Sequence, residues 1–132
     1  MRAHVVALTA AVEGAGWPVF FGDAGSSPPQ QYVLIITGSG DPAAEVNVTG
    51  TSVDIDTRVV VKCMGASPDA ALGMAGRVAG VLPARLVVPG RLVWLSRTGG
   101  LDVQVDRDTT ITGTATHPAF TTDFYRLISV PA

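Results

Sequence analysis

The side chains that could carry out chemistry are few and stand far apart in this sequence. His4 and His117 are the only histidines, and Cys63 is the only cysteine among 132 residues. Zinc sites need three or four such ligands at short spacings, so this inventory predicts no metal centre. Cys63 falls on the apolar phase of an expected strand, where a thiol behaves as an inert hydrophobic group rather than a nucleophile.

Motifs for nucleophilic or phosphate chemistry are also missing. The chain has no Gly-x-Ser-x-Gly elbow, and the Gly-Ser-Gly turn at 38–40 lacks the helix and lysine of a phosphate-binding loop. Asp54 and Asp56 alternate on the polar face of a strand, while Asp106 and Asp108 flank a strand end. Solvation and strand termination explain both carboxylate pairs better than a cation site. We therefore expect a protein that is not an enzyme and binds no cofactor.

Length and composition define the class of molecule. A chain of 132 residues and 13.6 kDa predicts a single domain over residues 1–132. Apolar residues make up 47% and charged residues 15%, which is the opposite of the balance in disordered chains. The net charge is −2 without a basic stripe, and no apolar run approaches the roughly 20 residues that span a bilayer. We expect an ordered domain that binds neither nucleic acid nor membrane, and the single cysteine fits a reducing compartment.

Hydrophobic periodicity predicts two helices and six strands in the order α-β-β-β-α-β-β-β. The expected elements are a helix over 2–14, strands over 18–22, 32–37 and 52–64, a helix over 67–82, and strands over 91–97, 101–107 and 120–130. This order predicts an α+β fold, with a mixed, mostly antiparallel sheet and both helices on one face. The run YVLIIT at 32–37 is apolar on both faces and predicts a covered central strand. Thr98-Gly99-Gly100 predicts the turn of a hairpin between 91–97 and 101–107.

The second helix has a clear start. Ser67 suits the N-cap, Pro68 suits the first helical position, and Asp69 favours the positive end of the helix. Its expected buried stripe comprises Leu72, Ala75, Val78, Ala79 and Leu82.

The strand expected over 52–64 alternates with period two. Its apolar side carries Val53, Ile55, Thr57, Val59, Val61 and Cys63, and the other side carries Asp54, Asp56, Arg58, Val60, Lys62 and Met64. Val60 and Met64 make that second side partly apolar, which is typical of a subunit interface. Arg58 and Lys62 either meet acids on a neighbouring subunit or belong to a solvated face, and both interpretations stay open.

The segment over 108–118 is polar, rich in threonine and poor in apolar anchors. Its central residues are Thr109, Thr110, Ile111, Thr112, Gly113 and Thr114. A segment with so little to bury does not offset its ordering entropy alone. We expect either a docking arm that orders on a partner or an ordinary solvated loop.

Three stretches, together covering nearly the whole chain, carry a likeness to a known family. They are GWPVFFGDAGSSPPQQYVLIITG, DIDTRVVVKCMGASPDAALGMAGRVAGVL, and GRLVWLSRTGGLDVQVDRD followed by FTTDFYRLISV. In order, length and texture they resemble the tail terminator (tail completion) proteins of long-tailed bacteriophages, especially those of actinobacterial hosts. The pieces Ser67–Asp69 and Val105–Asp108 are the most specific.

The resemblance implies a structural virion protein. Members of that family form rings, typically of six subunits, that cap the tail tube, stop its elongation and provide the surface that joins the head. The implied partners are further copies of the chain, the major tail tube protein and a head-completion or connector protein, with DNA only passing through the lumen. The implied location is the head-proximal end of the tail in the virion, and the host cytoplasm during assembly. A head-completion or adaptor protein of the same virion is the alternative, and a small host enzyme or ligand-binding domain is less favoured.

Overall fold

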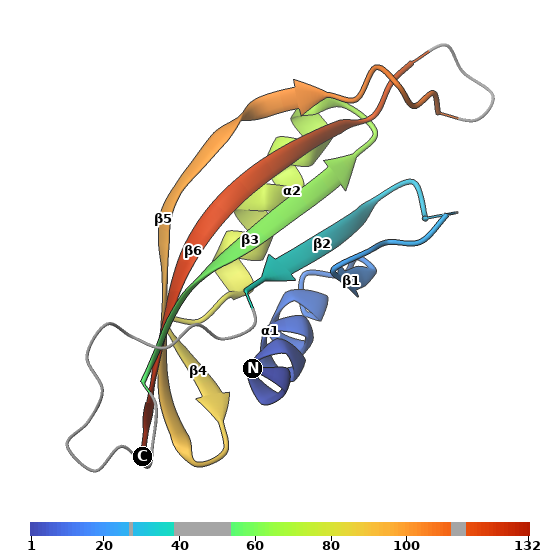
Figure 1. Ribbon diagram of the computed structural model, residues 1–132. Helices are drawn as coiled ribbons and strands as arrows, with labels where there is room; N and C mark the ends of the chain where they lie inside the picture. Colours follow the sequence, from blue (N-terminus) through green and yellow to red (C-terminus); the bar gives the residue numbers. More distant parts are fainter. Residues whose placement is uncertain (27, 39–53, 112–115) are drawn as a thin grey trace.

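The computed structural model, which describes residues 1–26, 28–38, 54–111 and 116–132, shows one curved, six-stranded sheet with two helices (Figure 1). The elements are α1 (Arg2–Glu13), β1 (Val19–Phe21), β2 (Tyr32–Thr37), β3 (Ile55–Gly65), α2 (Pro68–Val81), β4 (Arg85–Val88), β5 (Arg91–Val105) and β6 (Ala119–Pro131). The strands lie in the order β1-β2-β3-β6-β5-β4, and all neighbours are antiparallel except β1 and β2. The predicted fold class and element order are confirmed.

The core lies between the helices and one face of the sheet. In α1 the buried residues His4, Leu8 and Val12 follow one another at intervals of four, so they form a single stripe. Leu8 and Val12 share a core with Met74 and Val78 of α2, which places both helices on the same face. The strands contribute to this core through Val33, Ile35, Val59, Val61, Cys63, Leu86, Val88, Val93, Leu95, Tyr125 and Leu127.

The alternation expected along the third strand is confirmed within β3. Thr57, Val59, Val61 and Cys63 are buried, whereas Arg58 is exposed. β3 pairs with β2 on one side and with β6 on the other, so it is central in the sheet. Residues 52 and 53 of the expected strand, like the turn residues 39 and 40, lie outside the described residues.

The start of α2 is as predicted, and its buried face is so in part, because Val78 is buried and Ala75 and Leu82 pack against the core. The Ser67 hydroxyl accepts a hydrogen bond from the Ala70 amide at 3.1 Å, and Pro68 occupies the first turn. The buried residues are Ala71, Met74 and Val78, whereas Leu72 is 55% exposed. Two stripes one residue apart are both possible in this alanine- and glycine-rich helix. The long Met74 side chain fills the space above the sheet, and the helix is turned accordingly.

The hairpin expected around Thr98-Gly99-Gly100 is wrong. Residues 91–105 form one strand, β5, which pairs along nearly the whole length of β6. The register shifts between Arg97 and Gly99, so Thr98 and Gly99 lie at a bulge instead of a turn. The short strand β4, which the sequence did not suggest, supplies the remaining element and turns into β5 through Gly90, whose φ is 75°.

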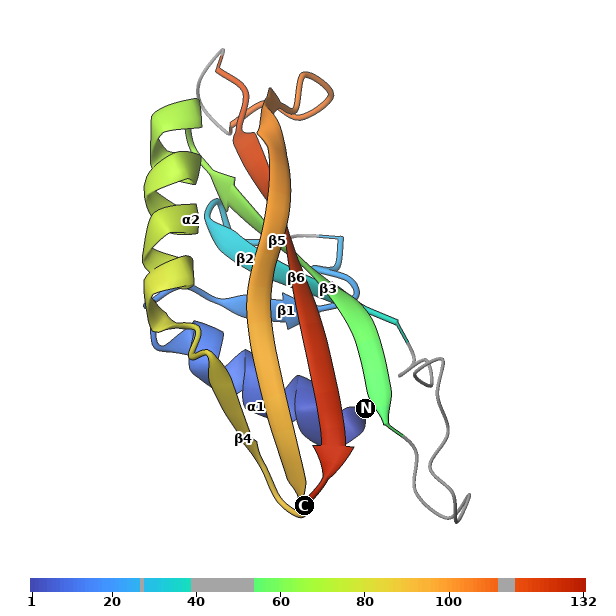
Figure 2. The same cartoon turned by 90° about the vertical axis from the view of Figure 1, so that its left-hand side faces the viewer.

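The second strand is covered on one face only, contrary to the prediction for YVLIIT. Val33 and Ile35 of β2 are fully buried under the helices, while Ile36 points the other way and is 37% exposed. Figure 2 shows α2 standing on one side of the sheet, with no helix of the described chain on the opposite side. We call this opposite side, made by the strand residues that point away from α1 and α2, the open face.

Candidate protein–protein interface

The four residues predicted at a subunit interface all lie on the open face. Arg58, Val60, Lys62 and Met64 alternate along β3 and point away from the helices, because their neighbours Val59, Val61 and Cys63 point into the core. The structure therefore brings these four residues together. It does not test whether they contact another subunit, which stays a prediction.

Aromatic rings of β6 lie beside the two cations of β3. The register places Val60 opposite Phe124 and Met64 opposite Phe120. The Arg58 guanidinium carbon lies 5.1 Å from the centre of the Phe124 ring, and the Lys62 Nζ lies 5.1 Å from the centre of the Phe120 ring. Such cation–π contacts stabilise exposed side chains by about 0.5–1 kcal/mol each. The cations are thus held over aromatic rings.

The acid expected beside Arg58 and Lys62 is engaged elsewhere. Asp56 accepts two hydrogen bonds from Arg126, at 2.9 Å from Nε and 2.6 Å from Nη2. These bonds lower the pKa of the Asp56 carboxyl. Arg58 lies directly opposite Arg126 across the two strands, so Asp56 offsets the repulsion between these like charges. Arg58 and Lys62 have no ion-pair partner among the described residues.

β5 and the edge strand β4 extend the open face with further exposed apolar side chains. Trp94 of β5 is 41% exposed and the guanidinium carbon of Arg85 lies 5.5 Å from its ring. Val87 of β4 is 89% exposed. By strand register the apolar residues of the open face are Phe20, Tyr32, Leu34, Ile36, Val60, Met64, Val87, Leu92, Trp94, Leu101, Phe120, Phe124, Ile128 and Val130. Val87 and Leu101 stand at its margins, since each also lines a groove beside one of the helices. An apolar surface spanning six strands is typical of a protein–protein interface.

A cleft at one end of the open face contains part of the predicted docking arm. Tyr32, Met64, Asp106, Ile111 and Pro118 are among the residues that line it. Asp106 holds the start of the arm, because its carboxylate accepts bonds from the Thr109 hydroxyl at 2.9 Å and from the amide of residue 108 at 3.1 Å.

Of the predicted arm residues, Thr109, Thr110 and Ile111 lie in this described part of the loop, beside the cleft. Thr112, Gly113 and Thr114 lie outside the described residues. The amide of Ile111 donates to the carbonyl of Thr116 at 2.9 Å, so the base of the arm is closed by a backbone hydrogen bond. Docking by this arm stays a prediction.

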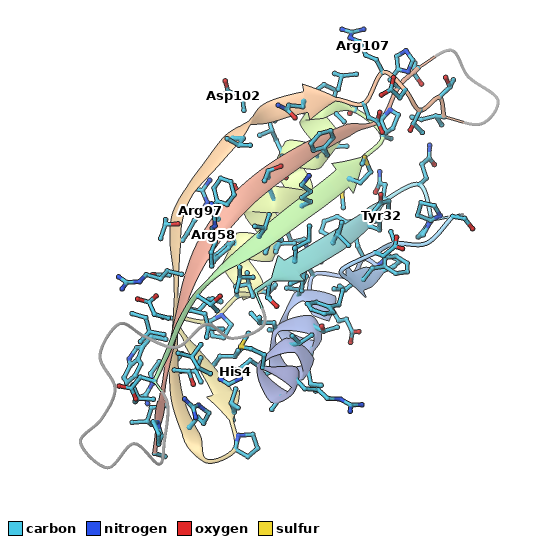
Figure 3. The ribbon with its side chains drawn as sticks, viewed as in Figure 1. His4, Tyr32, Arg58, Arg97, Asp102 and Arg107 are labelled. Atoms are coloured by element: carbon cyan, nitrogen blue, oxygen red, sulfur yellow. The ribbon has the colours of Figure 1, made fainter. Side chains whose placement is uncertain are left out.

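A second surface, on the helix side, lies between α2 and β5. Leu72, Ala75 and Gly76 of α2 and Asp102 and Val103 of β5 are among the residues that line this groove, which we call the α2–β5 groove. Figure 3 shows Asp102 projecting from the outer edge of β5. No described cation lies within ion-pair distance of Asp102.

An ion pair closes the floor of the α2–β5 groove. Arg97 Nη2 lies 2.8 Å from Asp123 Oδ1, and Asp123 is only 8% exposed. Gly100 passes directly beneath it, because a Cβ on this residue would stand 2.5 Å from Asp123 Oδ1 and 2.9 Å from Arg97 Nη2. The lack of a side chain at Gly100 therefore gives this ion pair its space, and the charge of Asp123 is already compensated within the chain.

The sequence analysis missed a buried polar contact at the other end of the sheet. His4 Nε2 and Ser129 Oγ lie 2.8 Å apart, and Ser129 also accepts from the Arg91 guanidinium. Burial, the N-terminal amine and Arg91 all lower the pKa of His4, which favours the neutral imidazole. The interval of four between His4, Leu8 and Val12 was the available signal that His4 is buried.

The remaining candidates for chemistry are not arranged as catalytic groups. Cys63 is fully buried, and burial raises the pKa of its thiol to about 11. Among the described residues no cluster of three or more His, Cys, Asp or Glu side chains could hold a metal ion. In the same part of the chain, neither helix has the length and apolar character needed to cross a bilayer.

The fold has counterparts among solved structures. A chain of the virion of a native gene transfer agent particle superposes with a TM-score of 0.55 at 17% identity, covering 98% of this chain and 100% of that one. A second solved structure, whose name describes no function, gives a TM-score of 0.50 at 16% identity over 96% and 92% of the two chains. No family model matches the sequence, and no curated protein matches it with significance. At these identities the likeness establishes a shared fold over almost the entire chain.

Proposed function

We propose that the protein is a non-enzymatic structural component of a phage-like virion, and more specifically a tail terminator. In this role copies of the chain form a ring, typically a hexamer, on the head-proximal end of the tail tube. The ring stops tube elongation and provides the surface on which the head is joined. Its partners are the major tail tube protein and a head-completion or connector protein, and DNA passes through its lumen without specific binding.

The end-to-end fold match with a chain of a gene transfer agent virion supports this proposal most directly. The match covers 98% of this chain and 100% of that one, so it concerns the whole arrangement of helices and strands rather than a common sub-motif. The sequence resemblance to tail terminators adds the finer assignment. The open face adds a physical reason for assembly. It presents aromatic and arginine side chains that no helix of the described chain covers, and such residues are enriched at the energetic centres of protein interfaces.

Assembly on tail tubes tests the proposal. Tubes are grown from the major tail tube protein of the same virion, with and without purified protein, and their lengths are measured by negative-stain electron microscopy. We expect added protein to stop growth and to appear as a cap at one end of each tube. Gold-labelled protein that binds heads and never tube ends would instead assign the head-completion role. Protein that binds neither heads nor tubes would refute a virion role.

Replacement of residues 109–116 by a Gly/Ser linker of equal length tests the docking arm. Of the described residues that it replaces, none belongs to the core, and the hydrogen bond from the Thr109 hydroxyl to Asp106 is lost, so we expect the variant to melt within a few degrees of the wild type. If the arm docks, the variant still folds but fails to yield joined heads and tails in an assembly reaction. Normal yields of infectious particles would show that residues 109–116 are an ordinary loop.

A further inference from the structure

The charges of this protein are divided unequally between the open face and the rest of the chain. The strand residues of the open face include four cations, Arg58, Lys62, Arg85 and Arg126, but one acid, Asp56, with Asp106 at the rim. Among the residues that the structure describes, the remaining positions hold five basic and eight acidic side chains, Asp106 included. The open face is thus cationic and aromatic, while the rest of the described chain carries an excess of acidic side chains.

From this division we infer that the open face packs against the α2–β5 groove of a second copy of the chain. The inference rests on the proposed ring and names the two surfaces that meet in it. A contact between two different surfaces is heterologous, so each copy offers one surface to each neighbour. A succession of such contacts closes into a ring when the rotation between copies fits.

The other described surfaces fit the open face less well. Two open faces packed together would bring Arg58, Lys62 and Arg85 of each copy against the same cations of the other, and like charges at an interface cost several kcal/mol. The shallow groove between α1 and β4 is apolar, but Arg2 is its only charged side chain, so it too would oppose cations with a cation. The cleft at Tyr32 lies at the end of the open face itself.

The α2–β5 groove has the complementary character. Asp102 offers an uncompensated carboxylate at its edge, whereas the charge of Asp123 is already paired with Arg97. Leu72 is 55% exposed and supplies apolar surface. A Cβ on Gly76 would meet no atom within 4 Å, so the surface of α2 at this residue is open and leaves room for side chains of a neighbouring copy. Apolar area and charge therefore match the open face together.

A nucleic acid fits the open face less well than a second copy does. Bases bind to protein surfaces by stacking on free aromatic rings. Here Arg58, Lys62 and Arg85 already lie over the rings of Phe124, Phe120 and Trp94. Aliphatic side chains such as Leu34, Ile36 and Ile128 surround these pairs, as in the centre of a protein interface.

Two charge reversals and their mixture test the inference. The face variant carries Arg58→Glu and Lys62→Glu, and the groove variant carries Asp102→Lys. Each variant alone places like charges across the contact, so we expect self-association to weaken by at least about tenfold in sedimentation velocity. In an equimolar mixture every contact again joins opposite charges, provided that the two variants alternate. We therefore expect near wild-type association, with native mass spectrometry showing even-numbered assemblies of equal composition.

Matched controls carry the same charge changes on other surfaces. Arg2→Glu with Arg107→Glu controls for the face variant, and Glu13→Lys controls for the groove variant, because all three residues are exposed outside both surfaces. We expect the controls to associate like the wild type. Thermal melts within a few degrees of the wild type establish that each variant is folded.

Four outcomes would overturn the inference. The first is a groove variant that associates as well as the wild type. The second is tighter association of the face variant with wild type than of wild type with itself, which indicates face-to-face packing. The third is a wild type that stays monomeric at millimolar concentration. The fourth is binding of a single-stranded oligothymidine to the wild type that the face variant loses.

The tube assay separates failure of this inference from failure of the proposed function. Tubes capped by the groove variant as efficiently as by the wild type would leave the tail terminator role standing while the assigned contact falls. Wild-type protein that self-associates through the two surfaces but never caps a tube would refute the tail terminator role and leave the assigned contact standing.

Discussion

Gly65, the last residue of β3, allows the first turn of α2 to approach the sheet closely. A Cβ at this position would stand 2.6 Å from the Ala71 amide nitrogen and 3.0 Å from Ala70 C and Ala71 Cα. Ordinary contacts begin at 3.4 Å, so the Gly65→Ala methyl would push the helix away by nearly 1 Å. The atoms in its way belong to the backbone and have no rotamer through which to escape.

The cost of Gly65→Ala follows from what that displacement breaks. The Ala71 amide donates to the Ser67 carbonyl at 3.0 Å, and the Ala70 amide donates to the Ser67 hydroxyl at 3.1 Å. Overpacking of a core costs about 1–3 kcal/mol, and the loss of a helix cap costs about 1 kcal/mol more. We expect the free energy of unfolding to fall by about 3 kcal/mol and the melting temperature by roughly 10 °C.

Gly73→Ala is the matched control, since it adds the same methyl group to α2 itself, on a side that faces no neighbouring atoms. A Cβ at Gly73 would meet nothing within 4 Å, so only helix propensity changes, and we expect a gain of about 1 kcal/mol. Urea unfolding followed by far-UV circular dichroism measures both variants. Equal stability of Gly65→Ala and the wild type would refute the close approach of α2 to β3.

Three further predictions concern His4, Cys63 and Gly100. The pKa of His4 in the folded protein lies below its unfolded value of 6.5, so below pH 6.5 the unfolded chain binds more protons than the folded one. The contribution of His4 to stability should therefore be full above pH 6.5 and fall as the pH drops toward the folded pKa. The variant His4→Gln should show a flatter pH dependence in thermal melts from pH 7.5 to 5. A pKa of about 11 in place of 9.0 lowers the thiolate fraction of Cys63 about a hundredfold. A thiol reagent at pH 8 should therefore react at least a hundredfold more slowly with the native than with the urea-unfolded protein. Equal rates would contradict the burial of Cys63. Gly100→Ala should displace the Arg97–Asp123 ion pair and lower stability by about 1 kcal/mol in urea unfolding, whereas Gly99→Ala, with nothing within 4 Å of its Cβ, should not.

Local signals in the sequence determined most of the helices and strands, and they also determined which residues of β3 lie together on the candidate interface. Period-two alternation placed Arg58, Val60, Lys62 and Met64 on one side of β3, because successive side chains of a strand must point in opposite directions. Ser67 and Pro68 marked the first turn of α2 because capping depends on residues that are adjacent in the sequence. The expected element order, and with it the α+β class, followed from such local patterns.

Tertiary contacts decided what local patterns left undetermined. Thr98-Gly99-Gly100 has turn chemistry, yet it lies within β5 because the thirteen residues of β6 offer a continuous row of hydrogen-bond partners on that side. The packing of Met74 against the sheet selected one of two equivalent faces of α2. His4 and Ser129 meet across 125 positions of sequence, a contact that no short window contains.

The open face itself is a property of the tertiary structure. Apolar residues on both sides of β2 gave no sign that helices cover only one of them, because periodicity does not distinguish a side packed within the chain from a side that awaits a partner. Phe120 and Phe124 come to lie beside Lys62 and Arg58 only through the register of β3 and β6. The sequence determined which residues share each face of a strand, and only the packing of the whole chain decided which face the helices bury.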